Sequence, residues 1–191
     1  MARHLPEIAR FFASKVSASH DADDLTARTF EILLGKLAQY RGDASPRTFL
    51  FAIAHNVLLG WVRDRRRGDA RIELGSVSAA ALGMSMTALL HARRQERVLL
   101  DALRAIPMDA QVLLELTYFE ELSRAEVAVV MGVPAGTVAS RLRRAKELLT
   151  QAIERRAESP EVAVSTATDL EGWARRLRAS LTPGTDDVGS S

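Results

Sequence analysis

The sequence predicts an all-α protein of two small helical domains, joined by a flexible linker and followed by a C-terminal extension. Apolar residues recur at helical spacing in nearly every periodic segment. Alternating β-branched residues, which would indicate a strand, never continue far enough to predict a sheet. Between Gly68 and Ala88 the composition changes to glycine, serine and alanine with few large apolar side chains, which is typical of a mobile linker.

The helical spacing also sets the expected domain boundaries. Helices are expected near Leu5–Ala18, Ala22–Gln39, Pro46–Arg67, His91–Ile106, Asp109–Phe119, Ser123–Met131 and Pro134–Arg156. The predicted parts are a first domain over residues 1–67, a linker over 68–90, a second domain over 91–156 and an extension over 157–191. The extension is polar and contains Pro160 and Pro183, so we expect it to be partly disordered.

Composition limits the classes of protein to which the chain can belong. Its 191 residues are 47% hydrophobic, which is enough for folded cores. The formal net charge is only +2, but basic residues cluster in Arg63–Arg71 and Arg141–Arg156. The chain has no cysteine, so disulfides, thiolate zinc sites and cysteine nucleophiles are excluded. No apolar run is long enough to span a bilayer, and the first residues lack the core of a signal peptide, so we expect a soluble cytoplasmic protein.

The segment Leu122–Leu149 has the pattern of a helix-turn-helix. Ser123 and Glu126 form a capping box at the start of a helix, Gly132 ends that helix, and Pro134 suits the first turn of the next. The apolar faces are expected to be Val127, Val130 and Met131 on the first helix and Val138, Leu142, Ala145 and Leu149 on the second.

The second helix of this unit also has a polar and basic side. Its residues are Thr137, Ser140, Arg141, Arg143, Arg144 and Lys146. Arginine and lysine can neutralise phosphates, and arginine forks and hydroxyls can bond to base edges, so the helix is suited to read a DNA groove. The alternative is an ordinary solvated helix surface, but the preceding capped helix and short turn favour DNA binding.

A second candidate site for nucleic acid lies in the first domain. The segment Pro46–Arg67 passes from apolar residues to Trp61 and then to four arginines, which are Arg63, Arg65, Arg66 and Arg67. An aromatic ring beside such a cluster can stack on unpaired bases while the arginines neutralise phosphates. The alternative is that Trp61 belongs to the core and that the arginines are a basic helix end favoured by the helix dipole.

Taken together, these segments resemble the extracytoplasmic-function (ECF) sigma factors, the small two-domain members of the sigma-70 family that direct bacterial RNA polymerase to promoters. The resemblance covers roughly Asp21–Thr150. Asp21–Phe30 is similar to the polymerase-binding helix of the family, Tyr40–Asn56 to its promoter-melting segment, and Ile106–Leu149 to the domain that binds the upstream promoter element.

The resemblance implies a role for individual residues. The expected polymerase-binding residues are Asp23, Asp24, Leu25 and Phe30, of which Leu25 and Phe30 could instead only pack the domain. Asn56 corresponds to the position that reads a flipped base of the melted minus-10 element, with Trp61, Arg63, Arg65, Arg66 and Arg67 nearby to hold the opened strand. A buried, helix-capping asparagine is the alternative for Asn56. Ser140, Arg141 and Arg144 correspond to positions that face the minus-35 element.

The family also implies partners. These are core RNA polymerase, promoter DNA that is duplex upstream and single-stranded downstream, and an anti-sigma factor of the kind that holds many members. The resemblance implies no cofactor, no metal, no membrane insertion and no catalytic activity of the chain itself. His4, His20, His55 and His91 are scattered without the spacing of metal ligands, and no phosphate-binding glycine loop is present.

The chain departs from the family pattern at several positions. Ala27 and Arg28 replace a usual Gln-Glu pair in the docking helix, which puts the affinity for polymerase in doubt. Ala139 replaces a usual basic residue and Thr117 stands where some members have arginine, so two expected phosphate contacts are missing. One helix common before the docking helix is also absent, so either Met1 is not the native start or the first domain is shorter.

Two other functions remain as alternatives. A conventional helix-turn-helix regulator would bind duplex DNA without polymerase, but it would leave the resemblance of Asp21–Asn56 unexplained. A degenerate sigma-like protein would keep the fold and bind only a regulatory partner, which Ala27, Arg28 and Ala139 favour.

Overall fold

The computed structural model describes residues 4–16, 18–68, 94–156 and 172. The regular elements in these ranges are all helices, which confirms the predicted all-α fold. They form two groups, called here module one (residues 4–68) and module two (residues 94–156). Most of the predicted linker and extension, and the start of the helix predicted from His91, lie outside the described residues.

Module one contains three α-helices around an aromatic core. They are α1 (Leu5–Ala13), α2 (Ser19–Lys36), which continues into the short η2 (Leu37–Gln39), and α3 (Pro46–Gly68). Phe11 packs edge-on against Phe12 and Phe51, with ring centroids 5.3 and 5.8 Å apart. All three rings are fully buried, so they fix α1 against α3.

The prediction of a first helix reaching Ala18 is wrong beyond Ala13. The last turn tightens, and the Lys15 amide donates to the Phe12 carbonyl at 2.8 Å. The Lys15 ammonium also folds back and donates to the Phe11 carbonyl at 2.8 Å. A basic side chain that satisfies a terminal carbonyl in this way stabilises a helix end.

Module two surrounds its longest helix. Its elements are α6 (Arg94–Ala105), α7 (Met108–Leu114), the π-helical turn η3 (Glu115–Phe119), α8 (Arg124–Met131) and α9 (Ala135–Glu154). α9 packs against α6, α7 and α8. No described helix by itself has the length and apolar character needed to cross a membrane, although α8 and α9, bent by 91°, meet that test as a pair.

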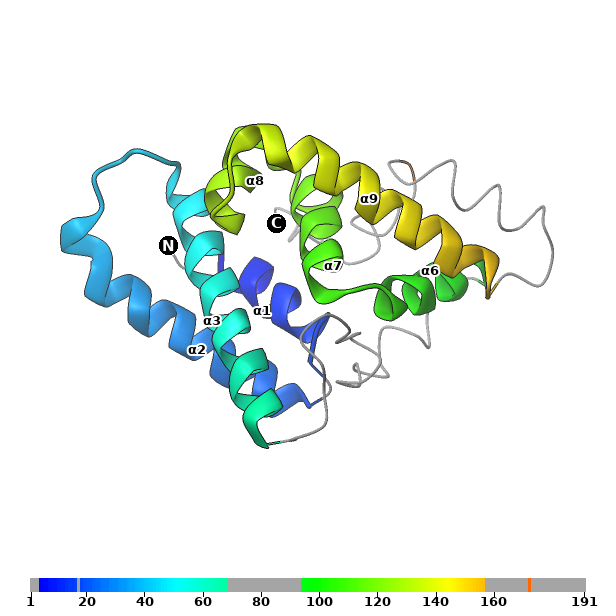
Figure 1. Ribbon diagram of the computed structural model, residues 1–191. Helices are drawn as coiled ribbons and strands as arrows, with labels where there is room; N and C mark the ends of the chain where they lie inside the picture. Colours follow the sequence, from blue (N-terminus) through cyan, green and yellow to red (C-terminus); the bar gives the residue numbers. More distant parts are fainter. Residues whose placement is uncertain (1–3, 17, 69–93, 157–171, 173–191) are drawn as a thin grey trace, which may run out of the picture.

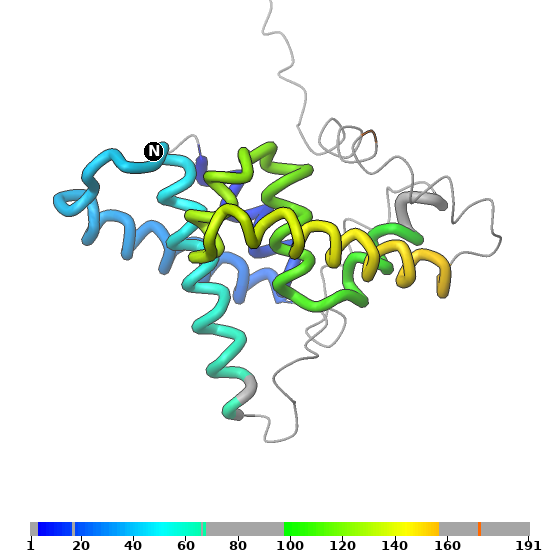
Figure 2. The backbone as a smooth tube through the Cα atoms, turned by 45° about the horizontal axis from the view of Figure 1, so that its top comes forward, coloured from blue at the N-terminus to red at the C-terminus, as the bar shows by residue number. Residues whose placement is uncertain are grey.

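The two modules lie side by side and are in contact through α3 and α8 (Figures 1 and 2). Their buried apolar side chains belong to one cluster, which extends from Phe11 and Phe51 to Val127 and Leu149. Thr48 and His55 of α3 are buried as well. The contact therefore removes polar groups from water, and these groups need partners.

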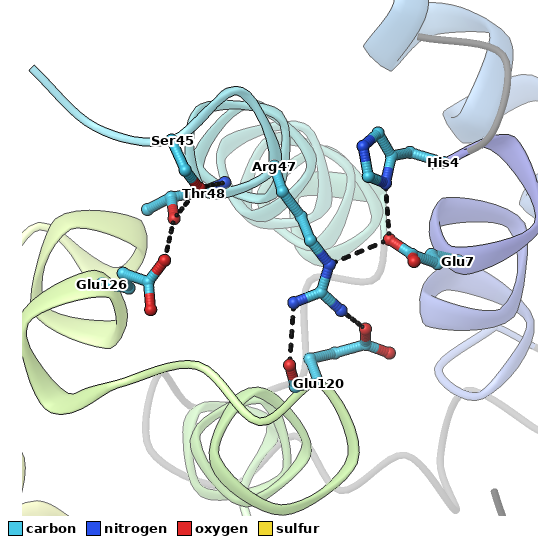
Figure 3. A network of polar contacts seen from close by, with 7 residues as sticks. All are labelled: His4, Glu7, Ser45, Arg47, Thr48, Glu120 and Glu126. Atoms are coloured by element: carbon cyan, nitrogen blue, oxygen red, sulfur yellow. Dashed lines mark hydrogen bonds and ion pairs between the residues drawn. The ribbon is translucent and has the colours of Figure 1, made fainter. Parts of the chain in front are cut away.

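Arg47, near the start of α3, binds acidic residues of both modules (Figure 3). Its Nε donates to Glu7 Oε2 of α1 at 3.1 Å, and its Nη1 donates to the Glu120 carbonyl of module two at 2.8 Å. Its Nη2 pairs with the Glu120 carboxylate. The neighbouring Thr48 hydroxyl donates to Glu126 Oε1 of α8 at 2.9 Å. Adjacent residues of α3 thus bind two carboxylates of module two.

Glu120 is a largely buried carboxyl group in this network. Burial, reinforced by the nearby Glu115 carboxylate, raises the pKa of Glu120 from 4.5 to about 7, although Arg47 acts in the opposite direction. Its side chain is only 8% exposed. Between about pH 4.5 and 7, the folded protein therefore keeps a proton on Glu120 that the unfolded chain has released.

We predict that Glu120→Gln removes a pH dependence of stability. The contribution of Glu120 is complete below its ordinary pKa of 4.5 and is lost as the pH rises through its folded pKa of about 7. At about 1.36 kcal/mol per pKa unit, the loss is at most about 3 kcal/mol. Urea unfolding at about pH 5 and about pH 8 should show a larger decrease in the free energy of unfolding for the wild type than for the variant. Glu154→Gln, at the exposed end of α9, is the charge-matched control, and identical pH dependence in all three proteins would contradict the prediction.

Candidate nucleic-acid interface

The first helix of the predicted helix-turn-helix begins with the expected capping box. Ser123 Oγ accepts a hydrogen bond from the Glu126 amide at 3.3 Å, and the Ser123 amide donates to Glu126 Oε2 at 2.9 Å. These bonds, together with the Thr48 hydroxyl, keep the pKa of Glu126 below its usual value. Glu126 is therefore a stable anion that serves both the cap and the contact with α3.

The turn between α8 and α9 depends on Gly132. Its φ of +63° lies in the left-handed region, as predicted for a glycine that ends a helix. Pro134 precedes the first residue of α9 and does not lie in its first turn, so that prediction was one position off. The Pro134 carbonyl accepts from the Thr137 amide at 2.9 Å, which makes proline the residue that starts the turn.

α9 brings four of its six predicted DNA-binding residues onto one face. Successive residues on a helix are turned by about 100°, so Thr137, Ser140, Arg141 and Arg144 lie within about 100° of one another. The last three are exposed, and Thr137 is half-buried. The Ser140 hydroxyl donates to the Thr137 carbonyl at 3.0 Å, and Arg144 Nη1 lies 3.3 Å from Glu147 Oε2. Hydroxyl and guanidinium groups are thus presented together from one side of the helix.

The other two predicted residues lie off this face. Lys146 follows Arg144 by two positions, which places it about 160° around the helix. Its ammonium lies 5.1 Å from the centroid of the Tyr118 ring, beside the buried side of α9. Arg143 projects from the flank, where its Nε lies 3.8 Å from Glu147 Oε1. Four of the six predicted residues therefore share one face of α9, and Arg143 and Lys146 lie outside it.

On α3 the corresponding face is formed by Asn56, Arg63 and Arg67. The intervals of seven and eleven residues place all three on one side of the helix, and all three are exposed. Asn56 Nδ2 donates to the Ala52 carbonyl at 2.9 Å. Asn56 is therefore neither buried nor at a helix end, so the alternative of a buried capping residue is wrong.

Trp61 and Arg65 do not join this face. Trp61 follows Asn56 by five residues, so it lies about 140° around α3, half-buried against the core. The Arg65 guanidinium lies 4.6 Å from the centre of its ring, and Arg65 Nη1 is 3.3 Å from Asp21 Oδ2 of α2. Trp61 and Arg65 therefore do not share the face of Asn56 as predicted, because Trp61 packs against the core and Arg65 is directed to α2. The side chain of Arg66 lies outside the described residues.

The four residues predicted to bind polymerase on α2 are divided in a similar way. Asp23 and Asp24 are exposed, whereas Leu25 is buried and Phe30 is half-buried against the core. For Leu25 the structure fits the alternative of a packing residue. Of these four residues, only the two aspartates offer exposed side chains to a partner.

Comparison with known proteins agrees with this arrangement of elements. The family model for sigma-70 region 2 matches residues 1–68, and the model for sigma-70 region 4 matches residues 96–149. The chain is 31% identical to the ECF RNA polymerase sigma factor SigC of Mycobacterium tuberculosis over 144 residues, which cover 72% of this chain and 73% of that relative. The chain belongs to the ECF sigma factors of the sigma-70 family.

Two further comparisons extend the likeness. The chain is 28% identical to the RNA polymerase sigma factor YlaC of Bacillus subtilis, over 75% of this chain and 84% of that relative. The fold is similar, with a TM-score of 0.60 and 22% identity, to the sigma factor RpoE in its co-crystal structure with the anti-sigma factor NepR from Bartonella quintana. That match covers 78% of this chain and 91% of the other.

The positions at which a departure from the family pattern is expected lie on or near the surface of this sigma factor. Ala27 and Arg28 are exposed on α2, and Arg28 Nη1 donates to Glu31 Oε2 at 2.9 Å. Ala139 is exposed near the start of α9. The Thr117 hydroxyl donates to the Leu113 carbonyl at 2.8 Å within module two, so it is directed to its own helix.

Sequence reasoning missed the residues that join the two modules of this sigma factor. Arg47 lies within the segment that resembles the promoter-melting region but was given no role of its own, and Glu120 was given none either. A regular helix would place Glu115 and Glu120 about 140° apart, so their spacing gave no sign of a shared role. The sequence feature that could have indicated them is a charged residue within a largely apolar segment, such as Arg47 before Thr48–Ala54.

Substituting the two glycines of the helix-turn-helix should have opposite effects on stability. Gly132→Ala places a side chain at a φ of +63° and should destabilise module two by about 1–2 kcal/mol. Gly136 lies in α9 with nothing within 4 Å of an added Cβ, so Gly136→Ala should be neutral or stabilise by up to about 1 kcal/mol. Thermal unfolding followed by circular dichroism compares the two, and equal shifts in Tm would argue against this role for Gly132.

Proposed function

We propose that this sigma factor directs core RNA polymerase to promoters by holding the melted minus-10 strand with module one and the minus-35 duplex with module two. The observation that carries the proposal is a pair of faces at the surface. One is Asn56 with Arg63 and Arg67 on α3, and the other is Ser140, Arg141 and Arg144 on α9 beside the half-buried Thr137. Each face lies in the module whose family model has the corresponding region. Promoter specificity would then come from two separate contacts.

In module two, the face of α9 enters the major groove. Arginine can bond to guanine O6 and N7 with both guanidinium nitrogens, and a hydroxyl can bond to either a base edge or a phosphate. Arg144 must first leave Glu147, but both side chains are well exposed, so breaking that pair requires little free energy. Arg141 and Arg144 are therefore the residues of α9 that we propose to contribute most to the free energy of DNA binding, through bases or phosphates.

In module one, Asn56 reads a base of the opened strand. Its side-chain amide has both a donor and an acceptor, which suits the edge of an unpaired base. Arg63 and Arg67 continue the same side of α3 and can neutralise phosphates of the strand. Trp61 and Arg65 lie on other sides of α3, where Arg65 stacks on the Trp61 ring and pairs with Asp21, so their proposed role is to hold α3 against the rest of module one.

Polymerase docking is assigned to the exposed part of α2. Asp23 and Asp24 would make its charged contacts, whereas Leu25 and Phe30 would support the helix from inside. We further propose that the chain acts in the cytoplasm, that it performs no catalysis of its own, and that an anti-sigma factor regulates it, as such a partner binds the structural relative RpoE.

Run-off transcription with purified bacterial core polymerase tests this function. A pool of promoters from the native genome should yield discrete transcripts only when the protein is present. No transcripts, with duplex binding intact in a gel-shift assay, would favour a helix-turn-helix regulator that acts without polymerase. Failure of both assays would favour a degenerate sigma-like protein that binds only a regulatory partner.

Arg144→Ala and Lys146→Ala should separate the DNA face of α9 from its flank. We expect Arg144→Ala to reduce transcription from a defined promoter and to lower the slope of log affinity against log salt by about 0.9 per lost phosphate contact. Lys146→Ala removes the same charge from a position beside Tyr118 and should have a smaller effect on both. Equal losses in the two variants would mean that net charge, and not this face, determines binding.

Asn56→Ala should weaken binding to melted DNA without weakening the fold. Alanine is a better helix former than asparagine, and the bond that is lost is an exposed one to the Ala52 carbonyl. Holoenzyme binding to a fork probe with an unpaired minus-10 strand should weaken by about 1–3 kcal/mol, the usual value of a base contact. Binding to a duplex with only the minus-35 element is the internal control. An unchanged fork affinity would remove Asn56 from the proposed site.

A further inference from the structure

Glu147 places a carboxylate on the DNA-reading side of α9. It follows Ser140 by seven residues, so the two side chains leave the helix within about 20° of each other. The side chain of Glu147 is 47% exposed, and it lies about one turn beyond Arg144. The predicted residues of this face carry hydroxyl or guanidinium groups, which suit a polyanion such as DNA. By contrast, phosphates repel the carboxylate of Glu147.

In the structure, Glu147 is held between two arginines of the same helix. Its Oε2 lies 3.3 Å from Arg144 Nη1, and its Oε1 lies 3.8 Å from Arg143 Nε. Around the helix, Glu147 lies about 60° from Arg144 on the DNA face and about 40° from Arg143 on the flank. Each carboxylate oxygen thus has its own arginine. Because all three side chains are well exposed, Arg144 can leave for DNA at little cost in free energy while Arg143 stays.

The departure of Arg144 leaves Glu147 Oε2 without that partner, on the side that faces the DNA groove. A carboxylate oxygen only accepts hydrogen bonds, so guanine O6 and N7 and thymine O4, which are acceptors as well, cannot bind it. The base-edge donors in the major groove are the amines of cytosine N4 and adenine N6. Cytosine suits a carboxylate better, because adenine also presents its N7 acceptor beside the amine. A carboxylate at this position can therefore distinguish base pairs that phosphate contacts cannot.

We propose that Glu147 is a specificity-determining residue, which accepts a hydrogen bond from the N4 amine of a cytosine beside the base pair that Arg144 contacts. The inference rests on the proposed function, because it requires α9 in the major groove. The three residues from Arg144 to Glu147 span about 4.5 Å along the helix, close to the roughly 3.4 Å between base pairs. Where another base stands there, the carboxylate lacks this donor and remains near phosphates, so Glu147 rejects that sequence.

A selection experiment tests this reading. The full chain with core polymerase is incubated with duplexes that contain a randomised segment, and the bound sequences are determined, with core polymerase alone as the blank. The wild type should select a motif that contains cytosine beside the position that Arg144→Ala relaxes. Glu147→Gln should change this cytosine to adenine, because a glutamine amide bonds to adenine N6 and N7 together. Glu147→Ala should remove the preference at this position and leave the rest of the motif.

Glu154→Gln is the matched control for the loss of charge. Glu154 is exposed and lies seven residues beyond Glu147 on the same side of α9, at the end of the helix. Its substitution should leave the wild-type motif intact. The helical content and Tm of every variant, measured by circular dichroism, should stay close to those of the wild type, because the pairs of Glu147 with the two arginines are exposed.

Affinities for two single sequences give the size of the effect. For the wild type, changing the selected cytosine to thymine should weaken binding about tenfold, whereas Glu147→Ala should bind the two duplexes within about twofold of each other. A gain in affinity for every sequence with an unchanged motif would overturn the proposal, because Glu147 would then only repel phosphates. An unchanged motif with unchanged affinities would overturn it as well. Absence of any motif in the wild type would instead overturn the proposed minus-35 contact, and the role of Glu147 with it.

Discussion

The arrangement of this sigma factor depends on the compensation of charges that the contact between the two modules removes from water. Lys15 is buried, and its only anionic partner in the network comes from the other module. Arg47 binds carboxylates from both modules. Buried ion pairs add little net stability, but the loss of one partner is strongly unfavourable. The ion pairs therefore make the contact specific in geometry, while they add only modestly to its free energy.

Glu126 connects this contact to the DNA-reading unit. Its carboxylate completes the capping box with Ser123 and also accepts from Thr48 of α3. The bond from Thr48 is separate from the two bonds that Ser123 and Glu126 exchange, so the cap of α8 itself is local to module two.

Much of the fold followed from local patterns in the sequence. The capping box at Ser123, the left-handed Gly132 and the buried positions Val138, Ala145 and Leu149 depend on a few neighbouring residues, and the structure has them where expected. The end of α1 at Ala13 was missed, because it depends on the Lys15 side chain turning back to the Phe11 carbonyl. On α3, the basic cluster was found but its division into two faces was not considered.

The sequence by itself determined the all-α class, the order of the two modules, their family and the polar face of α9, because helical periodicity and caps act over a few residues. Only the tertiary structure decided that Glu115 and Glu120 share a side, since a π-helical turn changes the angle between them. It also decided which charges are paired. Lys15 and Glu115 are 100 residues apart, and no local pattern relates two charges at that separation.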